Sequence, residues 1–329
     1  MKKGNAVSVI LGAVGMLVLI FDGRTAVHGI RAGIDMCLQT LIPSLFPFFI
    51  LSVLITGNIT GQSFQSMRLL SCICRIPTGT ESLFIVGILG GYPMGAKSIS
   101  DCYQRGLISA DDAKRMTIFC NNAGPSFIFG ILGSFFDGLR WIWAIWLIQI
   151  SSAILTAFVF PGQPNTAKQS NSGAHISIHR AVSGAIQSMA SVCGWVVLYR
   201  MILEFLNRWF LWFLPHWGQV IITGFLELSN GCLALQSISN ESIRFILANL
   251  MLSMGGLSVC MQTRAVFPQL NMRTYISGRT IHAGFSLMLS LAAISLLKGR
   301  YYELLIPLTV FTIFLILLLK IRKKEVAIT

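Results

Sequence analysis

Residues 90–130 read GGYPMGAKSISDCYQRGLISADDAKRMTIFCNNAGPSFIFG. Two apolar runs meet in this stretch, and each is interrupted by residues that are poorly suited to the middle of a membrane helix. The interruptions are Gly90–Gly95 and Asn121–Ser126. A broken helix leaves backbone N–H and C=O groups unpaired, which a bilayer tolerates only where protein or a water-filled cavity covers them. The two breaks are therefore the first place where a site is expected.

The composition is that of a chain embedded in a lipid bilayer. Of the 329 residues, 54% are hydrophobic and only 11% are charged, whereas soluble domains carry about 25% charged residues. The net charge is +13, but the basic residues are scattered between apolar runs or lie at the ends, in Met1–Lys3 and Lys320–Lys324. This distribution follows the positive-inside rule. It predicts a multi-pass cell-membrane protein with both termini cytoplasmic, and it does not favour a nucleic-acid partner.

No pattern for enzyme chemistry or metal binding is present in the sequence. The eight Cys residues form no CxxC pair and mostly lie inside apolar runs, where Cys behaves as a small hydrophobe. There is no Ser-His-Asp set, no HExxH and no pair of carboxylates at catalytic spacing. We therefore expect no enzyme activity, no metal site and no cofactor.

Apolar runs and polar breaks divide the chain into five parts. Ala6–Phe21 is expected as a retained first span, with a signal peptide as the alternative, and Asp22–Thr40 as an amphipathic helix lying at the interface. Further uninterrupted spans are expected at Leu38–Thr56, Leu139–Phe160, Ala181–Phe205, Ile281–Leu297 and Leu304–Leu319, and a re-entrant arm at Ser82–Ala96. The parts are 1–37 (first span and interfacial helix), 38–160 (first repeat), 161–180 (polar linker), 181–300 (second repeat) and 301–329 (last span and basic tail).

The two halves share a plan, which predicts an internal repeat. In the first half a helix begins at Ser109, with acids in its first turn that match a capping pattern, and runs into the break at Gly124. In the second half a helix begins near Asn240 and runs into the break at Gly255. Both spacings are 15 positions. The predicted fold is an all-α polytopic membrane protein with two structural repeats and broken or re-entrant helices, as in transporters, whose sites lie where such breaks meet.

Four short motifs carry a resemblance to a known family. They are Gly-Tyr-Pro-Met-Gly-Ala-Lys (91–97), Asn-Asn-Ala-Gly-Pro-Ser-Phe (121–127), Glu-Leu-Ser-Asn-Gly (227–231) and Gly-Gly-Leu-Ser-Val (255–259). Together they resemble the nucleoside recognition (Gate) superfamily, and within it the YlbJ-type sporulation integral membrane proteins, over roughly residues 35 to 300. The resemblance implies a multi-pass membrane protein with a role in spore formation, and transport by analogy with other Gate-domain proteins.

The candidate solute-binding residues are those of the breaks in both halves. In the first half they are Tyr92, Pro93, Gly95, Lys97, Asn121, Asn122, Gly124, Pro125 and Ser126. In the second half they are Glu227, Ser229, Asn230, Gly255, Gly256, Ser258 and Gln262.

Each part of this candidate site has a functional and a structural interpretation. A half-helix that begins at Pro125 or Ser126 would aim its free N–H groups at the midplane and favour an anionic group; alternatively, the Asn side chains cap a Pro kink internally. Gly255 and Gly256 form the partner break, or are small residues that let helices pack closely. Glu227 binds a cation or proton, pairs with Lys97, or is a carboxylate at the interface.

The prediction is a transporter- or channel-like protein of sporulation that binds a small polar solute, nucleoside-like or anionic, between its two repeats. A coupling cation or proton would act at Glu227, and a homo-oligomer is possible. The alternative is a membrane scaffold that does not transport and that recruits partners during assembly of the spore envelope. In that case the polar break residues would tolerate substitution, while surface loops such as Met67–Thr80 or Pro161–His179 would not.

Overall fold

The computed structural model describes residues 3–59, 67–160, 162, 176–304, 307, 309 and 312. Every element in these residues is a helix. Five of the helices are long and apolar enough to cross a membrane: Gly23–Ile55, Leu139–Val159, Ile178–Trp209, Glu241–Val266 and Met272–Leu297. About 20 residues are needed to cross a bilayer. The all-α, multi-pass prediction is confirmed, whereas the span at Leu304–Leu319, the basic tail and most of the 161–180 linker lie outside the described residues.

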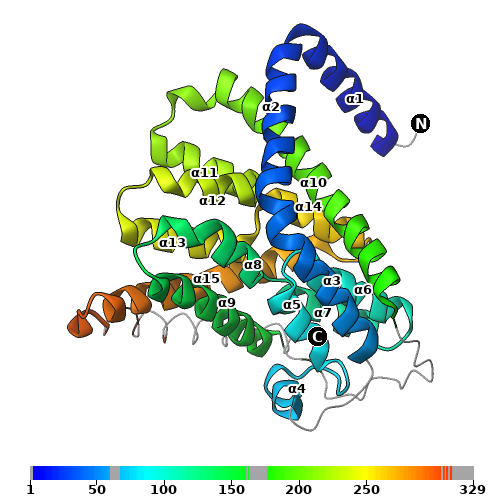
Figure 1. Cartoon of the computed structure of the whole chain (residues 1–329), viewed down its shortest axis with the longest axis vertical. Helices are drawn as coiled ribbons and strands as arrows, with labels where there is room; N and C mark the ends of the chain where they lie inside the picture. Colours follow the sequence, from blue (N-terminus) through cyan, green and yellow to red (C-terminus); the bar gives the residue numbers. More distant parts are fainter. Residues whose placement is uncertain are drawn as a thin grey trace.

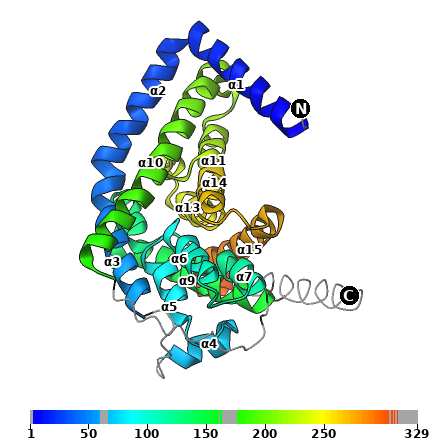
Figure 2. The ribbon, with the colours of Figure 1, turned by 90° about the vertical axis from the view of Figure 1, so that its right-hand side faces the viewer.

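A long pair of helices forms one side of the molecule (Figures 1 and 2). Helix α2 (Gly23–Met36) follows α1 (Lys3–Phe21) and packs along α10 (Ile178–Trp209). Gly29 and Gly33 allow this contact, because a Cβ atom added to either would lie 2.8 or 2.9 Å from a Cα atom of α10. Two glycines four residues apart are a common way for membrane helices to approach closely.

The expected interfacial helix at Asp22–Thr40 is not a separate element. α2 continues through a π-helical turn, η1 (Cys37–Leu41), into α3 (Ile42–Ile59), so that Gly23–Ile55 forms a single candidate span. Two of its polar residues have partners on α10. Asp22 pairs with Arg208 at 3.1 Å and His28 with Glu204 at 3.0 Å. The other charged residues of this helix, Arg24, Arg31 and Asp35, are exposed.

A second group of long helices consists of α9 (Leu139–Val159), α13 (Glu241–Met254) and α15 (Met272–Leu297), which pack on one another. The rings of Trp141 on α9 and Phe245 on α13 are both buried, with centroids 5.0 Å apart. α15 begins nine residues before the expected Ile281, because the Asn271 side chain accepts hydrogen bonds from the N–H groups of Arg273 and Thr274.

Broken helices fill the space between the two groups. Their segments are α5 (Glu81–Leu89) with α6 (Met94–Gln104), α7 (Ala110–Cys120) with α8 (Pro125–Phe127) and the π turn η3 (Ile128–Leu132), α11 (His216–Leu226) with α12 (Leu228–Ala234), and α13 with α14 (Gly256–Val266). The expected caps are confirmed: Ser109 accepts from the N–H of Asp112, and Asn240 accepts from the N–H groups of Ser242 and Ile243. The structural equivalence of the two halves stays a prediction.

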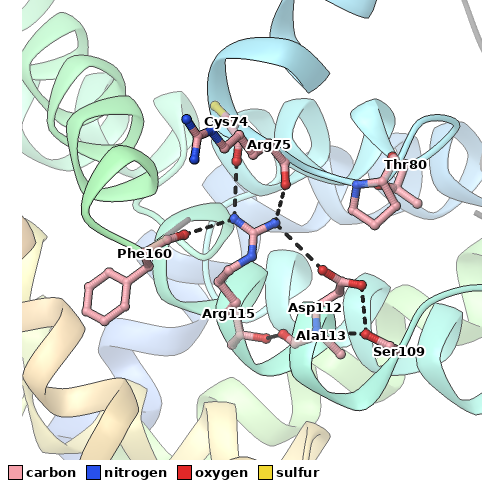
Figure 3. A network of polar contacts seen from close by, with 10 residues as sticks. Cys74, Arg75, Thr80, Ser109, Asp112, Ala113, Arg115 and Phe160 are labelled. Atoms are coloured by element: carbon pink, nitrogen blue, oxygen red, sulfur yellow. Dashed lines mark hydrogen bonds and ion pairs between the residues drawn. The ribbon is translucent and has the colours of Figure 1, made fainter. Parts of the chain in front are cut away.

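The start of α7 is held in place by Arg115 (Figure 3). Its guanidinium donates to the carbonyls of Cys74 and Arg75, at the end of α4 (Arg68–Cys74), and to the carbonyl of Phe160, at the end of α9. Asp112 lies 3.9 Å from the same guanidinium. Because these carbonyls belong to helix ends, where they have no helical partner, Arg115 ties three elements together and positions the helix that leads to the Asn121 break.

Short helical turns complete the described chain. They are η4 (Gly133–Phe135), η5 (Leu211–Phe213), η6 (Leu235–Ser237) and η7 (Tyr301–Leu304). η5 and the neighbouring helix ends present exposed aromatic side chains, including Trp209, Trp212 and Trp217. Aromatic residues of this kind are enriched where a membrane protein meets the lipid headgroups.

Candidate functional site

Residues from all four breaks meet around one small cavity of about 30 Å³. The first-half breaks contribute Gly91, Tyr92, Ala123 and Gly124, and the second-half breaks contribute Glu227, Leu228, Ser229, Val259 and Gln262. Apolar side chains of η1, α3, α8 and α10 complete the wall, among them Leu41, Phe127 and Val192. A water molecule needs roughly 10–15 Å³ of free space of this kind, so the cavity accommodates water but no larger solute in this conformation.

Glu227 is the acid of this cavity. Its carboxylate is buried and caps the N-terminus of α12, because Oε2 accepts from the backbone N of Asn230 at 2.7 Å and from its Nδ2 at 2.8 Å. Oε1 accepts from Ser258 Oγ at 3.3 Å. A negative charge is stabilised at a helix N-terminus, where N–H groups lack helical partners. The interpretation as a carboxylate at the interface is therefore wrong, and the residue lies in the interior.

Lys97 does not pair with Glu227. Its Nζ donates to the Gly184 carbonyl at 3.2 Å and to Ser188 Oγ at 2.9 Å, both on α10. The expected pairing rested on similar positions after two breaks, and a position in the sequence does not say to which side of α6 a side chain points. Lys97 ties α6 to the long helix pair, away from the cavity.

In the break before α8, the half-helix begins at Pro125 as predicted, but no Asn side chain caps its N-terminus. Gly124 is the N-cap and Pro125 the first helical residue, where a Pro without an N–H loses nothing. The Asn side chains bond elsewhere. Asn121 accepts from the backbone N of Ala96 and donates to Thr263 and Tyr275, while Asn122 donates to the Phe119 carbonyl. Neither Asn side chain caps the N-terminus of α8, but Asn122 bonds to a carbonyl in the last turn of α7 and so caps the kink internally on that side.

Arg279 is the central polar residue that the sequence did not reveal. Its side chain is fully buried on α15. One terminal nitrogen donates to the Asn121 carbonyl at 3.0 Å, to Asn122 Oδ1 at 3.1 Å and to the Ile118 carbonyl at 3.4 Å. The other donates to the Tyr92 hydroxyl and, at 3.3 Å, to the Leu252 carbonyl.

The charge of Arg279 matches the helices around it. Ile118 and Asn121 lie at the C-terminal end of α7, and Leu252 lies in the last turn of α13. A cation is stabilised at the C-terminal end of a helix, so Arg279 and Glu227 serve opposite ends of the broken helices. Tyr92 stands between them: its ring lines the cavity, and its hydroxyl donates to the Leu252 carbonyl at 2.8 Å while it accepts from Arg279.

Several glycines of the breaks are required by close backbone approach. Gly91 has φ +74°, and a Cβ added there would lie 2.8 Å from the Gly124 nitrogen. At Gly95 the added atom would lie 2.1 Å from the Cys120 carbonyl oxygen, and at Gly256, which has φ +71°, 2.9 Å from the Gly224 oxygen. The geometry gives both residues a packing role, which for Gly256 is the structural interpretation offered above.

Some of the predicted site residues line the cavity, others bond to Glu227, and the rest lie elsewhere in the breaks. Tyr92, Gly124, Glu227, Ser229 and Gln262 line it, while Asn230 and Ser258 hold Glu227. Pro93 precedes α6, Pro125 opens α8, and Ser126 is buried beside it with no hydrogen bond to the described residues. Gly255, with φ +77°, separates α13 from α14. Solute binding by any of these residues is still a prediction.

A second buried polar group lies beside the site. Gln149 on α9 donates to the carbonyl and side-chain oxygens of Asn249 on α13, at 3.2 and 3.3 Å, and to Ser253 and Ser286 at 3.2 and 3.3 Å. His282 is also fully buried on α15. In the sequence, Tyr275, Arg279 and His282 have the spacing of one helical face, a pattern that is easily mistaken for polar residues flanking the apolar run that begins at Ile281.

Comparison with known proteins gives one partial match. The chain is similar to the sporulation integral membrane protein YlbJ of Bacillus subtilis (strain 168), with 34% identity over 104 residues. The match covers 30% of this chain and a quarter of that protein's length. No protein-family model matches the chain, the Gate domain included, and no solved structure matches it. The chain is a multi-pass membrane protein with a distant relationship to a sporulation membrane protein.

Proposed function

We propose that this protein is a transporter- or channel-like membrane protein that binds a small polar solute where its broken helices meet. The observation that carries the proposal is that residues of all four breaks line one cavity, with one acid, Glu227, in its wall. Sites of secondary transporters are formed at such discontinuous helices. An ionisable side chain at this depth is costly and usually functional.

The lining favours a nucleoside-like solute over an anionic one. Glu227 is the single ionisable carboxylate or base among the cavity-lining residues, and a bound anion would lie beside its charge. The nearest cation, Arg279, is separated from the cavity by Tyr92 and is already surrounded by five acceptors. A neutral solute with hydroxyl and amide groups meets hydrogen-bonding partners in Ser229 and Gln262 and the ring of Tyr92 instead.

The proposal requires the cavity to widen. Binding sites for small molecules measure about 300–1,000 Å³, roughly ten to thirty times the volume present between the breaks. In this proposal the breaks have closed on one another in an occluded conformation, and solute binding requires them to separate. The partial similarity to a sporulation membrane protein further supports a role in spore formation.

The experiment is a screen on purified protein reconstituted in liposomes. Nucleosides and small dicarboxylates are tested for uptake and for an increase in the thermal unfolding temperature. We expect a nucleoside to give both responses, and Ser229→Ala to weaken them. Ser290→Ala is the matched control, because Ser290 is equally buried but bonds within its own helix, to the Ser286 carbonyl.

A negative screen would count against transport only with a second result. If no compound acts, and sporulation also proceeds normally with Glu227→Gln and Asn122→Ala, then the breaks have no solute to handle. The scaffold alternative would then gain support. If the screen finds a ligand that Ser229→Ala and Ser290→Ala bind equally well, the site lies elsewhere in the protein.

A further inference from the structure

An open pocket of about 420 Å³ lies between the long helix pair and the second-half broken helix. Its wall is formed by α2, α10, α11 and α12, through Ala32, Met36, Arg200, Asn207, His216, Gln219, Val220, Thr223, Asn230, Leu233 and Ala234. Ionisable side chains within membrane helices face the bundle interior or a water-filled cavity, and this wall includes Arg200 and His216. The pocket is therefore a place where water can enter the membrane-embedded part of the protein.

Asn230 separates this pocket from the cavity between the breaks. It lines the open pocket, and its backbone N and Nδ2 donate to Glu227, which lines the inner cavity. Beside it α11 and α12 leave no passage, because a Cβ added to Gly231 would lie 2.1 Å from the Cα of Gly224. One side chain thus stands between outside water and the buried carboxylate.

We propose that the open pocket is the aqueous route by which protons reach Glu227, and that Asn230 is the partition in this route. The inference rests on the proposed function, in which Glu227 is the acid of the solute site. Hydrogen bonds from Asn230 hold the carboxylate in the closed arrangement, and a turn of the Asn230 side chain would connect Glu227 to the water of the pocket.

The groups around Glu227 are compatible with a single titrating acid. From η1 and from α12 itself, the Cys37 and Cys232 thiols interact with it electrostatically. α3, α8, α10 and α14 present only uncharged side chains to the cavity. In the wall of the open pocket, Arg200 pairs with Glu204 at 3.4 Å, and His216 contacts Ser237 Oγ at 2.6 Å.

The test measures how fast a water-soluble carbodiimide modifies Glu227 in the full-length, reconstituted protein, with the site read by peptide mass spectrometry. Asn230→Ala should speed the modification roughly tenfold, equivalent to about 1.4 kcal/mol in the barrier. Adding Thr223→Trp, which fills the pocket, should remove this gain. Adding Ile221→Trp should not, because Ile221 is on the same helix but exposed outside the pocket.

Carbodiimide modification of a second buried acid, Glu81, reports whether a variant has unfolded. Glu81 is as buried as Glu227 but far from the pocket lining, so a variant that modifies both acids has lost its fold. Leu233→Trp then replaces Thr223→Trp as the pocket-filling variant. The proposal is overturned if the Asn230→Ala gain survives both filling variants, or if Asn230→Ala brings no gain. Because the assay uses no solute, a failure of solute uptake with these labelling results intact would remove the proposed function and leave the route standing.

Discussion

Replacement of Arg279 by Met is the most direct test of how the broken helices are held together. Met has a similar length and no hydrogen-bond donors. In the structure, the guanidinium serves five acceptors, of which three are backbone carbonyls: those of Ile118, Asn121 and Leu252. Its removal takes the donor from the Ile118 and Asn121 carbonyls and from Asn122 Oδ1, and leaves the Tyr92 hydroxyl as the donor to the Leu252 carbonyl of α13.

Two opposing free energies decide the size of the effect. Removing a buried charge recovers its desolvation cost, which makes some buried charges neutral or even unfavourable for stability. Against this, a buried polar group left without a partner costs about 1–3 kcal/mol, and Met leaves several such groups. The loss therefore outweighs the gain, and we expect a net destabilisation of about 3–5 kcal/mol, as is found when one member of a buried network is removed.

The assay is thermal unfolding of the purified protein in detergent. At about 2–4 °C per kcal/mol, Arg279→Met should lower the unfolding temperature by roughly 6–20 °C. Arg279→Lys should lower the unfolding temperature by a similar amount, because one ammonium cannot reach both groups of acceptors. Arg273→Met on the same helix is the control, since Arg273 is exposed. If the unfolding temperature of Arg279→Met lies within about 2 °C of this control, the free energies of unfolding differ by less than about 1 kcal/mol. The network then does not hold the breaks together.

Two further predictions concern packing and thiol exposure. Gly87→Ala should destabilise the protein by about 1–3 kcal/mol or more, as overpacking does, because the added Cβ would lie 1.6 Å from the Cys120 carbonyl oxygen. Gly133→Ala is the control in the same unfolding assay. It should be neutral or stabilising, because no atom lies within 4 Å of the added Cβ. A maleimide at pH 7 should modify the exposed Cys72 and spare Cys74, because Cys74 is fully buried. Burial raises the pKa of the Cys74 thiol to about 11, against the opposing effect of the nearby Arg115 charge. Equal modification of both residues, read by mass spectrometry, would show that α4 is oriented differently.

The positions of the breaks could be predicted because they depend on local chemistry. Ser109 and Asn240 cap the helices that run into the breaks, and Gly and Pro end or begin helices wherever they occur in an apolar run. The Arg200–Glu204 ion pair, spaced four residues apart on α10, depends on local chemistry in the same way, because its geometry is that of a single helix.

The expectations that were wrong all concern contacts between elements. Lys97 was expected near Glu227 and bonds to α10 instead. The helix at Asp22–Thr40 was expected to lie at the interface, whereas it packs along α10, where Asp22 and His28 have partners. A short polar pattern looks the same whether it faces solvent or another helix, so periodicity alone does not choose between the two.

By itself, then, the sequence determined that the chain is an all-helical, multi-pass membrane protein, that its helices break at Gly90–Gly95, Asn121–Ser126, Glu227 and Gly255, and that an acid lies at one break. Tertiary structure alone decided that the four breaks enclose one cavity, that Glu227 serves a helix N-terminus and that Arg279 serves two helix C-termini. The reason is physical: capping and chain breaks arise within a few residues, whereas the partner of a buried charge is set by how helices more than a hundred residues apart pack together.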